Sequence, residues 1–175
     1  MSIADYIYQP LKWEQPHTFK MEYALHSSGT VVAQLKFRSS WGTLATGESA
    51  DGCWTFKRVG FFQTRVTVRA CGEEEELAAF HQNTWSQGGT LVLADGRKYR
   101  ATTNFWSTEL RLETEAGERL VAVKTGGFIH MSANVEIAPA AAHLAELPWL
   151  VMFVWYLAIM LYQDAAAVTA VAAST

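Results

Sequence analysis

Residues 147–162 read LPWLVMFVWYLAIMLY, sixteen positions without a single charged side chain. Pro148 is tolerated only in the first turn of a helix, so the segment predicts a helix that begins here and runs to about residue 163. A helix that is apolar on every face must be buried, either in protein or in lipid. The location of this segment therefore decides the fold.

Two features of the segment favour a protein interior. Sixteen residues rise about 24 Å, which is less than the roughly 30 Å hydrocarbon core of a bilayer. Trp155 and Tyr156 stand in the middle of the run, whereas membrane helices keep such residues near the interfaces. No Lys or Arg follows Lys124, and residues 165–175 form a small apolar tail that we expect to fray. The alternative is a tail-anchored membrane protein with a cytosolic β-domain.

The chain from about residue 18 to residue 137 alternates between apolar and polar side chains, as strands with one buried face do. The pattern is clearest at its end, where the apolar positions are Ile129, Met131, Ala133, Val135 and Ile137. An earlier run of the same kind places Phe19, Met21, Tyr23 and Leu25 on one face. Short turns such as Asp95-Gly96 separate the runs, which predicts sequential antiparallel strands.

A barrel of about twelve strands leaves a lumen that its strands cannot fill, and the sequence supplies one helix that is hydrophobic all round. We therefore predict a single, mainly β domain over residues 1–175. Its strands would form a closed antiparallel barrel around the central C-terminal helix. The core residues of that helix would be Trp149, Phe153, Trp155 and Tyr156.

Two groups of residues resemble a known family. Many short strands followed by Leu147-Pro148-Trp149 and Val154-Trp155-Tyr156, together with Gly88-Gly89-Thr90-Leu91, are similar to the tubby C-terminal-like superfamily. This superfamily includes phospholipid scramblases and LURP-one-related proteins, and the resemblance is to its small bacterial members, over about residues 18–163. It implies a twelve-stranded barrel around a C-terminal helix. Scramblase-like lipid handling is an alternative function, although the Pro-rich, Cys-rich and acidic segments of scramblases do not occur here.

The composition argues against several classes of function. The net charge of −3 and the pI of about 5.9 do not provide the basic field that nucleic acid requires. No nucleophile, phosphate-binding or metal motif occurs, so we expect no catalytic residue, metal or cofactor. Glu73–Glu76 is interpreted as a solvated acidic loop, and His130 as part of a solvent face. Cys53 and Cys71 are predicted to form no disulfide framework, and Cys71 to be inert, in a reducing cytosol.

Cationic residues provide the candidate binding site. The first group lies on one predicted hairpin and consists of Lys57, Arg58, Arg65 and Arg69; the second lies on another and consists of Arg97, Lys98 and Arg100. If the two groups adjoin, they could bind an anionic lipid headgroup, each charge contributing about 1 kcal/mol; otherwise they are solvated strand faces. We therefore expect a non-catalytic binding or scaffold module, cytoplasmic or peripheral to a membrane. Its partner would be anionic lipid headgroups or a protein.

Overall fold

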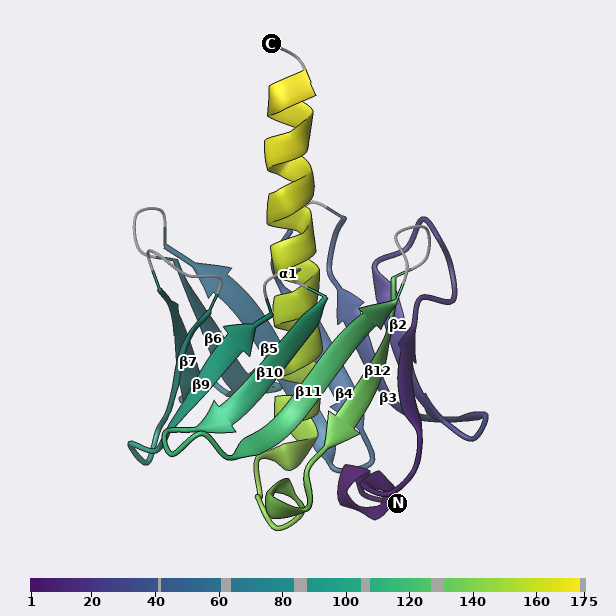
Figure 1. The fold of residues 1–175 in the computed structure, drawn as a ribbon, viewed down its shortest axis with the longest axis vertical. Helices are drawn as coiled ribbons and strands as arrows, with labels where there is room; N and C mark the ends of the chain where they lie inside the picture. The colour runs from purple at the N-terminus through teal and green to yellow at the C-terminus, as the bar shows by residue number, and fades with distance from the viewer. Residues whose placement is uncertain (41, 61–63, 84–87, 105–107, 127–130, 174–175) are drawn as a thin grey trace.

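The protein is a closed barrel of antiparallel strands with one long helix along its axis, as Figure 1 shows for a computed structural model. The structure describes residues 1–40, 42–60, 64–83, 88–104, 108–126 and 131–173, and the side chains of the helix as far as Thr169. The prediction of a mainly β barrel around a C-terminal helix is confirmed.

Twelve strands form the wall, and each pairs with its neighbours in the sequence. Their bounds are β1 Leu11–Glu14, β2 Glu22–Ser27, β3 Thr30–Phe37, β4 Ala45–Ser49, β5 Gly52–Val59, β6 Arg65–Ala70, β7 Glu76–Gln82, β8 Gly89–Leu93, β9 Lys98–Thr103, β10 Glu109–Thr114, β11 Arg119–Gly126 and β12 Ser132–Ile137. The barrel closes where β1 pairs with β12, with Leu11 opposite Val135. Closure leaves no unpaired sheet edge, which would otherwise invite aggregation.

The helix α1 spans Leu147–Ala173 and follows two short 3-10 turns, η1 (Ile3–Tyr6) near the N-terminus and η2 (Pro139–Ala141). From Leu147 to Met160 every residue of α1 is buried inside the barrel. The predicted end of the helix near residue 163 is wrong, because the helix continues to Ala173, although its buried part ends at Met160. No Gly or Pro follows Pro148, and alanine is the strongest helix former, so nothing in the sequence stops the helix earlier.

Stacked and tilted aromatic rings join the helix to the wall. Trp155 stacks on Trp13 with ring centroids 6.0 Å apart, and Tyr156 stacks on Phe37 at 5.6 Å. Trp155, Tyr156 and Phe153 are fully buried, and Trp149 is 5% exposed. The aromatic content of the chain therefore fills the lumen that twelve strands create.

Each strand runs antiparallel to the one before it, so successive connections lie at opposite ends of the barrel. We call the end at which α1 leaves the barrel the exit end; beyond it α1 projects away from the wall, at the top of Figure 1. The connections that follow β1, β3, β5, β7, β9 and β11 lie at this end. Contacts of α1 agree with that placement, since Tyr156 donates a hydrogen bond to the carbonyl of Thr43 at 2.6 Å, in the connection after β3. The N-terminus, η2 and the start of α1 lie at the opposite end.

Some predicted strand positions differ from the structure. A first strand, β1, precedes the predicted start at residue 18. Phe19 lies in the connection after β1 and is 95% exposed, so its predicted place on a buried face is wrong. The alternation also places Val31 on the buried face with Ala33 and Leu35, but Val31 is 45% exposed. A register shift in the β2–β3 pair between Leu25 and His26 accompanies this difference. Ile129, which the alternation also includes, lies outside the described residues.

Candidate functional site

Two of the seven predicted site residues hold the helix in the barrel. Arg58 belongs to the inward-facing row of β5, with Phe56, and its guanidinium donates two hydrogen bonds to the carboxylate of Asp164, both at 2.9 Å. Arg97 donates at the opposite end to the carboxylate of Glu146. Asp164 and Glu146 are 18 residues apart, which corresponds to about 27 Å along a helix. These two arginines therefore act at different ends of α1 and form no shared patch.

Glu146 is a nearly buried carboxylate just before α1, and Tyr99 and Arg97 both donate hydrogen bonds to it. Burial pushes the pKa of Glu146 upward, but the hydrogen bonds from Tyr99 and Arg97 outweigh it and keep the pKa below its usual value. Burial, reinforced by the bond to Glu146, raises the pKa of the Tyr99 phenol. The cluster thus keeps a charged carboxylate satisfied where the chain enters the barrel.

The other five predicted residues face outward on the wall formed by β5 to β9. They are Lys57, Arg65, Arg69, Lys98 and Arg100. Lys57 and Lys98 lie in one cross-strand row, through Thr67, Ala79 and Val92. Arg65 and Arg100 lie in the next row, through His81 and Thr90. Neighbouring strands are about 4.8 Å apart, so these pairs are separated by about 19 Å and 14 Å along the sheet.

The curvature of the barrel prevents these five outward-facing cations from forming one flat patch. The four strand steps from β5 to β9, out of twelve, turn the outward direction by about a third of a circle. Only Arg65 and Arg69 share a partner, Glu76, at 3.1 and 3.0 Å. The hydrogen bond from Arg69, with Arg65 beside it, lowers the pKa of the Glu76 carboxyl. The two predicted hairpins therefore lie on the same wall but do not converge on one point.

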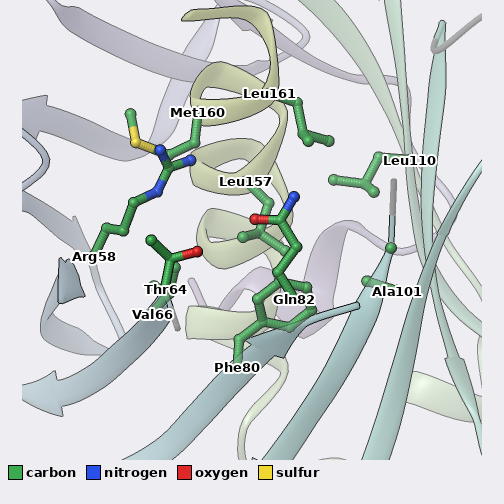
Figure 2. A pocket seen from close by; sticks show the side chains of 11 residues that line it. Arg58, Thr64, Val66, Phe80, Gln82, Ala101, Leu110, Leu157, Met160 and Leu161 are labelled. Atoms are coloured by element: carbon green, nitrogen blue, oxygen red, sulfur yellow. The ribbon is translucent and has the colours of Figure 1, made fainter. Parts of the chain in front are cut away.

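A pocket opens between α1 and the wall at the exit end (Figure 2). Leu157, Met160 and Leu161 project into it from the helix, and Phe80 lines it from β7. Arg58 is the charged residue of its lining, and its guanidinium is already bound by Asp164. The cavity holds about 20 Å³, room for about one water molecule. The helix therefore occupies the space that a barrel ligand would need.

Cys53 and Cys71 form a disulfide between β5 and the residue after β6, so the prediction that they do not pair is wrong. The β5–β6 register places Trp54 opposite Ala70, and the cysteines one step further face each other with Cα atoms 5.4 Å apart. That distance lies within the range for disulfides. Only the register reveals the pairing, because a sequence separation of 18 carries no such signal. The cysteines consequently give no support to a reducing compartment.

The two ends of the barrel differ in charge, a feature that sequence reasoning missed. The six connections at the exit end contain Lys20 and Arg38 in their sequence, and neither Asp nor Glu. The connections at the opposite end contain eight acids and one basic residue, Arg97, which pairs with the nearly buried Glu146. Glu73, Glu74 and Glu75 are among the exposed acids. Assigning the turns alternately to two ends would have shown this asymmetry, since a meander of antiparallel strands reverses at every turn.

Sequence-based predictions also concern the acidic run, His130 and possible metal-binding groups. The acidic run is exposed at Glu73–Glu75, while Glu76 begins β7 and binds Arg65 and Arg69. His130 lies outside the described residues. Among the residues that the structure describes, no group of three or more His, Cys, Asp or Glu side chains could hold a metal ion.

Comparison with known proteins supports the fold. No protein-family model matches the chain, and no curated protein matches it in sequence. A crystal structure of the Arabidopsis thaliana protein AT5G01750 is similar, with a TM-score of 0.53 and 13% sequence identity. The similarity covers 86% of this chain and 95% of that one. At this identity the likeness concerns the fold alone.

Proposed function

We propose that this protein is a non-catalytic binding module of the tubby-like, LURP-one-related type that attaches peripherally to anionic membranes. The exit end would face the lipid headgroups. The observation that carries the proposal is the charge difference between the two ends of the barrel. Anionic lipid repels the acidic end and attracts the end that carries Lys20 and Arg38.

The position of α1 favours surface attachment over the alternatives. A tail anchor would need the residues from Leu147 to Met160 in lipid, and in the barrel all of them are covered by the wall. A ligand inside the barrel would have to displace the same residues. Attachment at the exit end requires neither change, because it uses a surface that is already exposed.

The outer wall contributes less than its charge suggests. Lys57, Lys98 and Arg100 are exposed. Lys98 and Arg100 share the outer face of β9, but Lys57 on β5 points about a third of a circle away from them, so a flat membrane cannot touch all three from the side. Lys20 and Arg38 belong to one end and can reach one plane together. Each basic residue close to an anionic surface contributes about 1 kcal/mol.

Vesicle co-sedimentation tests the proposal. Wild type should pellet with vesicles of phosphatidylcholine and phosphatidylglycerol, and less as salt rises, because screening shortens the reach of exposed charges to about 8–10 Å. Lys20→Glu with Arg38→Glu should weaken binding by about 2 kcal/mol or more, roughly thirtyfold. Lys98→Glu with Arg100→Glu is the matched control, because it changes the net charge equally on the outer wall. Equal and negligible pelleting in every condition would refute the proposal and leave a protein partner.

A further inference from the structure

We infer that the exit end enters the hydrocarbon region of the membrane, led by α1 beyond Tyr162 and by Phe19. This insertion rests on the membrane attachment proposed above and specifies how the contact is made. Headgroup charge would orient the barrel, and apolar side chains would anchor it.

The projecting part of α1 has no polar face. Five successive residues, Ala165 to Thr169, are all exposed and cover every direction around the axis. Four are apolar, and the hydroxyl of Thr169 donates a hydrogen bond to the carbonyl of Ala165 inside the same helix. The sequence continues as Ala-Val-Ala-Ala to Ala173. A helix that docks on another protein keeps a polar face toward water, whereas one that is apolar on all sides is surrounded by protein or lipid. The wall ends below this segment (Figure 1). Lipid is therefore the environment that matches its whole circumference.

Large apolar side chains at the same end are also exposed to solvent. Phe19 is 95% exposed, Val168 71% and Tyr162 41%. Gln163 of α1 lies against Met21, two residues after Phe19, so the helix leaves the barrel beside this connection. Tyr162 stands where the helix passes from the wall into solvent, the level at which tyrosine is enriched in membrane proteins.

The connections at the two ends also differ in their aromatic residues. Each of the six connections at the exit end contains Phe or Trp, and the connections at the opposite end contain no Phe, Trp or Tyr. Of these aromatic residues the structure describes Phe19 alone, and Phe19 is the one assigned to the membrane contact.

The charge and length of α1 fit this placement. Asp164 is the single charged residue of the helix, and its pairing with Arg58 at 2.9 Å neutralises it at the level where the apolar segment begins. From Leu161 to Ala173 the helix rises about 20 Å. That length exceeds one leaflet of hydrocarbon, about 15 Å or half of the bilayer core.

An environment-sensitive fluorophore tests insertion directly. Val168→Cys is labelled with NBD and mixed with vesicles of phosphatidylcholine and phosphatidylglycerol, with and without lipids that carry a doxyl quencher on the acyl chain. We expect the emission to rise severalfold and the quencher to suppress it. Tyr8→Cys is the matched control, because Tyr8 is 82% exposed and lies between η1 and the start of β1, at the opposite end of the barrel; its label should not respond.

The outcomes separate insertion from attachment. Pelleting without a fluorescence change at position 168 would overturn insertion and leave headgroup attachment standing. Absence of pelleting would overturn both. A chain that is dimeric in water, with the label at position 168 already shielded and indifferent to vesicles, would overturn insertion in favour of pairing between two copies.

A second pair of variants measures the apolar contribution without labels. Phe19→Ser with Val168→Asp alters two exposed residues, so the fold should be retained. We expect binding to the vesicles of phosphatidylcholine and phosphatidylglycerol, measured at a moderate salt concentration that screens the charge added at position 168, to fall about tenfold or more, since burying one large apolar side chain is worth about 1.5–3 kcal/mol. Tyr8→Ser should leave it unchanged. Unaltered binding of the double variant would contradict insertion.

Discussion

Phe153→Ala tests whether the helix is the core of the barrel. Phe153 is fully buried. Its ring packs against those of Phe80, Phe56 and Trp149, with distances between ring centroids of 5.7, 6.3 and 6.5 Å. Truncation of a buried Phe costs about 3–5 kcal/mol. The upper part of that range is expected here, because the ring lies among three aromatic neighbours in a closed wall that cannot collapse into the gap.

The loss is large compared with a total stability of about 5–15 kcal/mol. For a domain of this size each kcal/mol lowers Tm by about 2–4 °C, so a loss of about 4–5 kcal/mol from Phe153→Ala should lower it by roughly 8–20 °C. Thermal unfolding followed by near-ultraviolet circular dichroism measures the shift. Val168→Ala is the control on the same helix, and being exposed it should change stability by less than about 0.5 kcal/mol. A Phe153→Ala protein within about 1 kcal/mol of wild type would refute the core role of the helix.

Two further predictions concern contacts that fix the helix and the wall. Glu146→Gln should destabilise the protein by about 1–3 kcal/mol at neutral pH, because a charged hydrogen-bond acceptor is lost. The folded state lowers the pKa of Glu146, so the stability that this carboxylate contributes is complete above the unfolded pKa of about 4.3 and disappears as the pH falls through the lower folded pKa. Urea unfolding of wild type and Glu146→Gln at a series of pH values should show that their difference in stability vanishes in acid. A difference that stays constant with pH would contradict this role. Cys53→Ser with Cys71→Ser should cost about 2–4 kcal/mol, and adding a reductant should then lower the Tm of wild type but not of the variant; a reductant effect on both would disprove the assignment.

Much of the fold follows from local patterns in the sequence. Ala133, Val135 and Ile137 alternate with polar residues and are buried as predicted, because a half-buried strand has a period of two. The uncharged run from Leu147 has no polar face, so only a lumen or a lipid could contain it. The same pattern placed the end of the run near residue 163, close to the last buried residue, Met160, because Gln163 and Asp164 interrupt the apolar sequence. It did not show that the helix continues beyond them to Ala173.

The candidate site was predicted less well, because it depends on register and curvature. The alternation could not show that Arg58, in the inward-facing row of β5, binds Asp164, or that Arg97, in the connection before β9, binds Glu146. Those contacts join residues that are 106 and 49 positions apart. Phe19 was assigned to a buried face because it continues the alternation of β2, although the strand begins only at Glu22.

Hydrogen–deuterium exchange with and without anionic vesicles tests most directly whether the barrel keeps its helix while its exit end binds lipid. We expect the amides from Leu150 to Met160 to be equally protected in both samples, since they remain inside the wall. Vesicles should add protection from Leu161 to Ala173 and around Phe19, and none at Glu73–Glu75. Loss of protection between Leu150 and Met160 on vesicles would contradict the account, because it would mean that the helix leaves the barrel to enter the membrane.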